Sequence, residues 1–118
     1  MKKLALVIGL LALSSQAAFA QDPLVVNANL AHLKFENARV RVLEATLKPG
    51  DKENLHSHPS YVVYVIEGGK VRNHTADGKV GESELKTGDV LYRDPLTHWS
   101  ENIGTTTIHL IVVELKEK

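Results

Sequence analysis

Apolar and polar side chains alternate over short stretches of this chain, a pattern typical of β-strands buried on one face. Val40 and Val42, for example, alternate with Arg39 and Arg41. In segment 105–115, positions 108, 110 and 112 share one face, and positions 109, 111 and 113 share the other. The run 61–66 is β-branched and aromatic, which predicts a strand buried on both faces. After residue 20, no segment of useful length has the 3.6-residue period of a helix.

Turn sequences separate these segments at short intervals. They are Pro49-Gly50, Gly68-Gly69, Asp77-Gly78 and Thr87-Gly88-Asp89, and Asp-Gly is among the strongest signals of a tight hairpin. Between them we predict further strands at 24–26, 32–36, 40–47, 71–74, 82–86 and 90–92. Many short strands with regularly spaced turns predict an all-β sandwich or barrel. The chain has no internal repeat, low-complexity tract or linker, so we expect one folded domain.

The first twenty residues have a different character. Lys2 and Lys3 precede an apolar run at 4–13, and Ala18-Phe19-Ala20 has the small-x-small pattern of a cleavage site. These three features predict a secretory signal peptide, residues 1–20. The apolar run is too short to span a bilayer, so we favour cleavage after Ala20 over a retained membrane anchor. We therefore expect a mature domain of residues 21–118 in the periplasm or secreted, with no stable membrane anchor after cleavage.

Charge and cysteine content narrow the possible partners. Removing Lys2 and Lys3 from the 14 basic residues leaves 12 against 14 acidic residues. This balance argues against nucleic acid or an anionic membrane as the main partner. The chain has no cysteine, so an exported domain of this size depends on its core or on oligomerisation for stability. We expect a homodimer, with the apolar strand at 108–113 offering an edge that a second copy covers.

The candidate chemistry begins with His56 and His58. In an extended strand, side chains at i and i+2 point to the same face, so both imidazoles reach one point in space. Imidazole is the commonest protein ligand of transition metals. The pair lies between Gly50 and Gly69, in a segment that resembles the first signature of the cupin superfamily: Gly, five residues, His-x-His, three residues, Glu, six residues, Gly. The two glycines and two histidines keep every spacing, but Val62 stands at the glutamate position.

A second segment resembles the second cupin signature, which runs Gly, five residues, Pro-x-Gly, two residues, His, three residues, Asn. His98 and Asn102 keep their relative spacing. Gly88 lies one residue closer than the pattern asks, and Arg93 and Pro95 replace the Pro and the second Gly. The resemblance implies an all-β fold, the cupin double-stranded β-helix or jelly-roll barrel, in a small exported cupin.

The resemblance also implies a metal site made of His56, His58 and His98. Val62 cannot ligate, which leaves two interpretations open. In the first, three neutral imidazoles hold a divalent ion and leave open positions for water or substrate, as in three-histidine zinc sites. In the second, the lost carboxylate has weakened metal binding and the barrel is a metal-free binding cavity. Zinc is the first expectation for an exported protein, with iron or manganese as the alternative if the chain is an oxygenase.

Several neighbours of the histidines are candidate site residues. Strand parity from His58 places Val62 and Tyr64 inward, on the pocket wall. Tyr61 approaches the metal only if a bulge shifts the register. We expect Glu101, and Asn102 beside it, to support the ligand His98 by hydrogen bonding. The remaining histidines are His32, His74 and His109, to which the sequence assigns no role.

Three functions remain open at this point. The chain is a metal-dependent enzyme acting on a small molecule, a non-catalytic barrel that binds a sugar or an organic acid, or an exported barrel for protein association. Three neutral ligands leave the positive charge of the ion uncompensated, so we expect the small-molecule ligand to be anionic. Fold resemblance does not name that ligand or the reaction, and whether the chain is an enzyme stays open.

Overall fold

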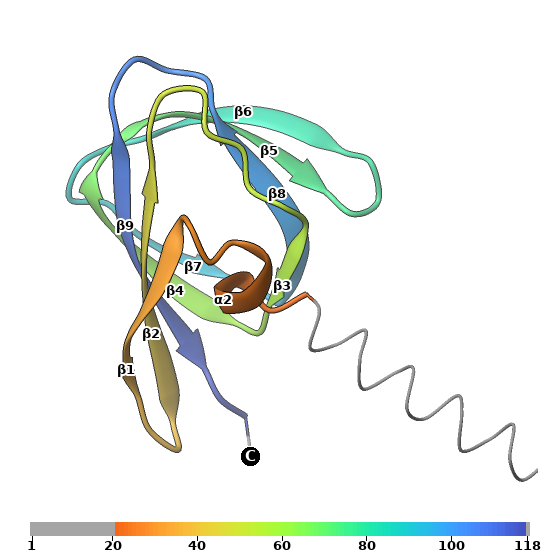
Figure 1. Ribbon diagram of the computed structural model, residues 1–118, viewed down its shortest axis with the longest axis vertical. Helices are drawn as coiled ribbons and strands as arrows, with labels where there is room; N and C mark the ends of the chain where they lie inside the picture. The colour runs from red at the N-terminus through yellow and green to blue at the C-terminus, as the bar shows by residue number, and fades with distance from the viewer. Residues whose placement is uncertain (1–20, 118) are drawn as a thin grey trace, which may run out of the picture.

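Two antiparallel sheets face each other and enclose the interior of the chain (Figure 1). The computed structural model describes residues 21–117, so the predicted signal peptide lies outside the described residues. Within them the elements, in chain order, are α2 Pro23–Val26, β1 Ala31–Glu36, β2 Val40–Leu47, β3 His56–His58, β4 Tyr61–Glu67, β5 Gly69–Thr75, β6 Val80–Leu85, β7 Val90–Arg93, β8 Leu96–Asn102 and β9 Ile108–Leu115. No helix among these is long and apolar enough to cross a bilayer.

The all-β fold predicted from the strand pattern is confirmed, and so is the jelly roll that the cupin resemblance implies. One sheet has the strand order β1-β2-β9-β4-β7, and the other has the order β3-β8-β5-β6. Neighbours in each sheet are often distant in sequence, because the chain crosses repeatedly from one sheet to the other. This winding brings the first and last strands of the described chain into the same sheet.

The last strand, β9, lies in the middle of its sheet and is no edge. It pairs with β2 on one side and with β4 on the other, with Val112 opposite both Leu43 and Val63. The expectation that a second copy pairs with an exposed edge at 108–113 is therefore wrong. Local periodicity predicted the strand and its faces, but it carries no information on which strands flank it.

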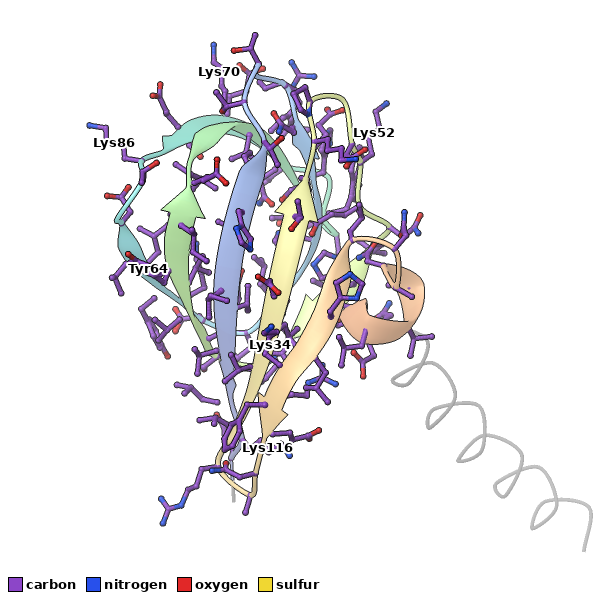
Figure 2. The ribbon with its side chains drawn as sticks, turned by 60° about the vertical axis from the view of Figure 1, so that its left-hand side comes forward. Lys34, Lys52, Tyr64, Lys70, Lys86 and Lys116 are labelled. Atoms are coloured by element: carbon purple, nitrogen blue, oxygen red, sulfur yellow. The ribbon has the colours of Figure 1, made fainter. Side chains whose placement is uncertain are left out.

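The core lies between the inner faces of the two sheets. In the larger sheet, alternate residues of β2, β4 and β9 point inward, and its buried cluster is Leu43, Tyr61, Val63, Val65 and Val112. The outer face is uncovered in the monomer, so β4 is buried on one face only. Tyr64 is 46% exposed and points away from the barrel (Figure 2). The expectation of a strand buried on both faces is therefore wrong for β4.

The segment 24–26, expected to be a strand, is the short helix α2. Asp22 caps it by accepting a hydrogen bond from the Leu24 N–H at 2.9 Å, and Pro23 occupies the first turn, where no donor is needed. The Ser57 N–H donates to the Gln21 carbonyl at 2.8 Å. Residues 21–27, which we call the N-terminal strap, are thereby held against β3.

Two glycines show why the predicted turns form. Gly78 has φ of +90°, a conformation that favours glycine, and it completes the Asp77–Gly78 turn between β5 and β6. Gly68 has a packing reason, because a Cβ there would lie 1.9 Å from the carbonyl oxygen of Leu85. The hairpin and the turn after β4 are therefore confirmed.

Candidate metal centre

Three histidines converge where β3 meets β8. His56 pairs directly with His98 across the two strands, and His58 follows two residues along β3 on the same face. One ring nitrogen from each lies within 4.8 Å of the others. The ring centroids are separated by 4.7 Å for His56 and His98, by 4.8 Å for His56 and His58, and by 5.4 Å for His58 and His98. The three side chains are placed to hold one metal ion.

The second ring nitrogen of each histidine is already engaged. Each Nδ1 faces an oxygen acceptor: Asn54 O at 2.8 Å from His56, Glu114 Oε2 at 2.6 Å from His58, and Asn73 Oδ1 at 2.6 Å from His98. A carbonyl or carboxylate oxygen only accepts, so each Nδ1 carries the proton. At His56 the 2.8 Å contact with the Asn54 carbonyl decides, because Asn27 Nδ2, which lies 3.1 Å from the same Nδ1, is a donor that bonds to the Asn54 carbonyl instead. This fixes the tautomer and leaves the lone pair of Nε2 free on all three rings, which is how protein ligands of metals are commonly arranged.

His56 is braced by the N-terminal strap. Asn27 is 1% exposed, and its Nδ2 lies 3.1 Å from His56 Nδ1 and 3.2 Å from the Asn54 carbonyl. Its Oδ1 accepts from the Asn54 N–H at 2.7 Å. Asn27 therefore holds the loop whose carbonyl orients His56.

His58 begins a longer chain of charged groups. Its partner Glu114 accepts from Arg41 Nε at 2.9 Å, and Arg41 also donates to both carboxylate oxygens of Asp22, at 2.8 and 2.9 Å. The hydrogen bonds from Arg41 hold the pKa of Asp22 below its usual value. The same bonds raise the pKa of the Arg41 guanidinium. Both groups are therefore ionised at neutral pH.

Burial keeps two of the three rings neutral. Burial, with a smaller contribution from the neighbouring imidazoles, lowers the pKa of His56 to about 4 and that of His98 to about 3. The desolvation of the imidazolium form is the main cause. A neutral imidazole is the form that binds a metal, so protons do not compete for these two ligands near neutral pH.

The centre opens into a cavity of about 450 Å³. Its walls are mostly aliphatic, with contributions from Leu43, Val63, Leu91, Leu110 and Val112 among others. Its polar lining includes Glu53, Tyr61 and Arg93 beside the three histidines. Other polar residues also line it, namely Asn27, Asn73, Thr75, Lys79, Glu82, Ser83 and Ser100. The chain therefore surrounds a largely apolar space that also has polar and charged groups on its walls.

Glu53, Tyr61 and Arg93 differ in their contacts and in their state of protonation. Glu53 accepts from the Ser100 N–H at 2.9 Å, and burial raises its pKa to about 7. Burial also raises the pKa of Tyr61 to about 12, so its hydroxyl stays protonated. Within residues 21–117, no carboxylate lies within ion-pair distance of Arg93. Its charge reaches the site and helps to lower the pKa of His98.

The expectation that Val62 and Tyr64 point into the barrel is wrong. Tyr61 points inward instead, and it does so without a bulge. Tyr61 is 4% exposed, lines the cavity, and has its ring centroid 4.4 Å from that of His58. Val62 and Tyr64 lie on the opposite face. The cause is the bend at residues 59–60, where β3 ends and β4 has not begun. Counting by two through that bend inverts every assignment in β4, and the inward valine is Val63.

Glu101 and Asn102 also lie apart from the ligand imidazoles. Glu101 is on the outer face of β8, where it accepts from His74 Nε2 and from Arg72, both at 3.1 Å. Asn102 donates to the carbonyls of Leu47 at 2.9 Å and Thr106 at 2.8 Å. It therefore joins the end of β2 to the loop before β9. Neither residue bonds to His98, so the expected support comes from other side chains.

The remaining histidines lie outside the centre. His74 stacks on Trp99 with ring centroids 3.7 Å apart, His109 Nε2 lies 2.6 Å from Glu44 Oε2 on the outer face, and His32 is exposed. Sequence reasoning missed Asn27, Asn73 and Glu114. Only Glu114 left a signal, because a carboxylate there continues the inward parity of the apolar positions 108, 110 and 112.

Comparisons with known proteins agree with this architecture. No protein-family model matches the chain, and no curated protein matches it. Solved structures do. A cupin domain from Bordetella pertussis Tohama I is 27% identical with a TM-score of 0.68, and the match covers 75% of this chain and 93% of that one.

More distant structures have the same fold. A protein with a double-stranded β-helix domain from Klebsiella pneumoniae is 24% identical with a TM-score of 0.56, covering 70% of this chain and 68% of that one. An RmlC-like cupin family protein from Methanocaldococcus jannaschii is 16% identical with a TM-score of 0.58, covering 72% and 79%. The chain has the cupin fold and belongs to the cupin superfamily. Among solved structures, it is similar to the Bordetella cupin domain over most of that domain's length.

Proposed function

We propose that the chain is an exported cupin that binds one divalent transition metal through Nε2 of His56, His58 and His98, and a small carboxylate-bearing ligand in the adjoining cavity. The observation that carries the proposal is the engagement of all three Nδ1 atoms by oxygen acceptors. Rings oriented in this way present three lone pairs to one point, and the donor set suits a borderline metal ion.

Zinc is the metal we expect first. Affinity for nitrogen ligands favours copper and zinc over manganese and iron, unless geometry intervenes. A site with three neutral histidines suits zinc and leaves a coordination position open. Iron or manganese is the alternative. When bound, such an ion supplies Lewis acidity to a ligand oxygen, and the open position gives a small molecule access to it.

The ligand class follows from charge and shape. The three imidazoles do not neutralise the ion, and Arg93 has no carboxylate partner among the described residues, so the site attracts an anion. The aliphatic walls favour a ligand with an apolar body. A short carboxylic acid whose carboxylate faces the ion and Arg93, and whose carbon chain extends into the cavity, satisfies both requirements.

Metal content and direct binding test the proposal. Protein purified without metal-binding tags or chelators should contain about one equivalent of metal, and apo-protein should bind zinc in a competition titration against a chromophoric chelator. His98→Ala should lose this binding, while His109→Ala, which removes a histidine of the outer face, should keep it. Equal zinc affinity in wild type and His98→Ala would remove the site.

A metal-free binding barrel is the second candidate. It is favoured by the valines at positions 62 and 63, which leave the centre without a carboxylate ligand from β4. In that case the purified protein should contain no stoichiometric metal and should carry a small organic acid, which mass spectrometry of the denatured protein detects.

A further inference from the structure

Three charged residues, Glu114, Arg41 and Asp22, are linked by hydrogen bonds to the Nδ1 side of His58. A neutral acceptor would be enough to orient the imidazole. Glu114 is 2% exposed, and it accepts a hydrogen bond from a candidate metal ligand and another from Arg41. Arg41 is itself held by Asp22 through two hydrogen bonds. One guanidinium lies between two carboxylates, so this outer-sphere relay of Asp22, Arg41 and Glu114 has a net charge of minus one.

The relay lies next to a candidate metal centre whose own ligands include no negatively charged group. The three histidines are neutral donors, and the inward residues of β4 nearest to them are Tyr61 and Val63, neither of which supplies a carboxylate. An imidazole that donates its Nδ1–H to a carboxylate becomes a stronger donor at Nε2. The 2.6 Å separation of His58 Nδ1 and Glu114 Oε2 is that of a strong, charge-assisted hydrogen bond.

We propose that Glu114, held by Arg41 and by Asp22 of the N-terminal strap, is a positioning residue that supplies the metal centre with negative charge through His58 in place of a carboxylate ligand. This inference rests on the proposed metal site. It assigns the charge of the centre to a residue of the last strand and to the first residues of the described chain, and it makes the strap part of the metal centre.

The relay has a matched control within the same chain. Glu44 and His109 form a carboxylate–imidazole pair with the same 2.6 Å separation, but they lie on the outer face of the barrel. Glu114→Gln keeps a carbonyl oxygen to accept from His58 and removes the charge. Glu44→Gln makes the identical change where no metal ligand is involved. Comparing the two separates the effect on the centre from the general effect of losing a carboxylate–imidazole bond.

The test is zinc affinity measured by chelator competition, with thermal unfolding of each apo-protein as a check of folding. Outer-sphere partners of metal ligands typically contribute about tenfold to a hundredfold in affinity, so Glu114→Gln should weaken zinc binding by that factor, and Glu44→Gln should leave it unchanged. The nitrogen-15 shift of His58 Nδ1 should move in the first variant only. Asp22→Asn, which retains a good helix cap, should weaken binding by a smaller factor.

Each outcome separates the inference from the site on which it rests. If wild type binds no divalent ion, the proposed metal site and the relay are both overturned. Zinc binding in Glu114→Gln within about threefold of wild type, below the range of outer-sphere effects, overturns the relay and leaves the site. Should Glu114→Gln fail to fold, Asp22→Asn decides, and an unchanged affinity in that variant overturns the part assigned to the strap.

An independent observation concerns the outer face of the larger sheet. Strand pairing aligns five apolar residues, one from each strand, in a single row: Phe35, Val42, Val113, Val62 and Tyr92. The next row on the same face contains Ile111, Tyr64 and Val90. We call these eight residues the outer apolar face. Phe35, Tyr64, Val90 and Tyr92 are among the most exposed large hydrophobic residues of the described chain.

The size of this face suits a protein interface. With strands about 4.8 Å apart and same-face residues about 7 Å apart along each strand, the eight residues cover about 270 Å² in projection. Side chains raise the accessible area above that value. An apolar patch of this size is at the scale of the largest found on monomers, which are often functional, and with a surrounding rim it approaches the roughly 800 Å² per partner of a standard interface.

The rim charges favour a second copy of this chain over a charged partner. Beside the face, Glu44 pairs with both Lys34 at 3.4 Å and His109 at 2.6 Å, and Lys116 pairs with Glu36 at 2.5 Å. These charges are neutralised within the chain, so they give a strongly charged partner nothing to recognise and do not repel a copy. Two copies of one sheet can also pack face to face about a two-fold axis, in the way that the sheets of a sandwich pack.

We infer that two copies of the chain associate through the outer apolar face, sheet against sheet. Light scattering of wild type in the micromolar range should give the mass of a dimer. Tyr64→Glu places a charge in the face and should give a monomer. Val25→Glu is the matched control, because Val25 is 47% exposed and lies on α2, away from the face, and it should remain a dimer. A monomeric wild type, or a dimeric Tyr64→Glu, overturns the inference.

Discussion

Glu53 provides a quantitative test of the cavity, because it is a carboxylic acid whose protonation is tied to folding. It lines the cavity near the three histidines, and burial raises its pKa from 4.5 to about 7. In the unfolded chain the same group titrates near 4.5. Between these two values the folded protein binds a proton that the unfolded chain has released, so the free energy of unfolding falls as the pH rises.

The magnitude follows from the size of the shift. A shift from 4.5 to about 7, at 1.36 kcal/mol per unit, corresponds to about 3 kcal/mol in total, most of it lost between about pH 5 and pH 8. His56 and His98 act in the opposite direction. Their pKa values are lowered by burial, so the unfolded chain takes up protons first as the pH falls below 6.5, and stability decreases toward acid.

The variant Glu53→Gln isolates the carboxyl from the histidines. Glutamine keeps an oxygen for the Ser100 N–H and does not titrate. Unfolding by urea, with a chelator present to exclude metal, should show the free energy of unfolding of wild type falling by about 2 to 3 kcal/mol relative to Glu53→Gln between pH 5 and pH 8.

Glu84 supplies the control, since it is exposed on β6. The difference between wild type and Glu84→Gln should stay nearly constant over the same range. A difference between wild type and Glu53→Gln that also stays constant would show that Glu53 is solvated, and the burial of this carboxyl in the cavity wall would be wrong.

Three further predictions concern the site and the N-terminus. Val62→Glu should leave zinc affinity in a chelator competition unchanged, because the side chain lies on the outer face of β4. A changed affinity would show that residue 62 points inward after all. Arg93→Met should weaken the binding of a short aliphatic carboxylate to zinc-loaded protein by about tenfold to a hundredfold, the value of a charge-assisted hydrogen bond, with zinc affinity retained; calorimetry measures both. Mass spectrometry of protein recovered from the periplasm or the medium should find Gln21 at the N-terminus, and retention of residues 1–20 would contradict cleavage after Ala20.

Local patterns in the sequence predicted local structure well. The strand at 40–47 has the bounds of β2, because its alternation runs without interruption from one turn to the next. The hairpin at Asp77-Gly78 forms because the turn requires the positive φ that Gly78 has. The three histidines converge because two lie at i and i+2 on one strand, and the third is directly opposite on its neighbour.

Features that depend on the path of the whole chain could not be predicted from local sequence patterns. The position of β9 between β2 and β4 depends on how the sheets wind. The helix α2 replaces an expected strand because Asp22 caps it and the strap is anchored at both ends, by Ser57 and by Asn54. Those contacts join segments that are about thirty residues apart, and no local period reports them.

The bend at residues 59–60 explains why the sequence predicted the convergence of the three histidines but not the residues of the pocket wall. Strand parity is reliable only within an uninterrupted strand. It therefore relates His56 to His58 but does not pass from His58 to β4. Once β4 is counted from its own first residue, Tyr61 and Val63 face the cavity, while Val62 and Tyr64 fall on the outer apolar face. With this corrected parity, neither inward residue of β4 next to the histidines is a carboxylate. The carboxylate that contacts the three histidines comes from Glu114 on β9, the strand paired with β4, and it accepts a hydrogen bond from His58 Nδ1, which leaves Nε2 of that ring free.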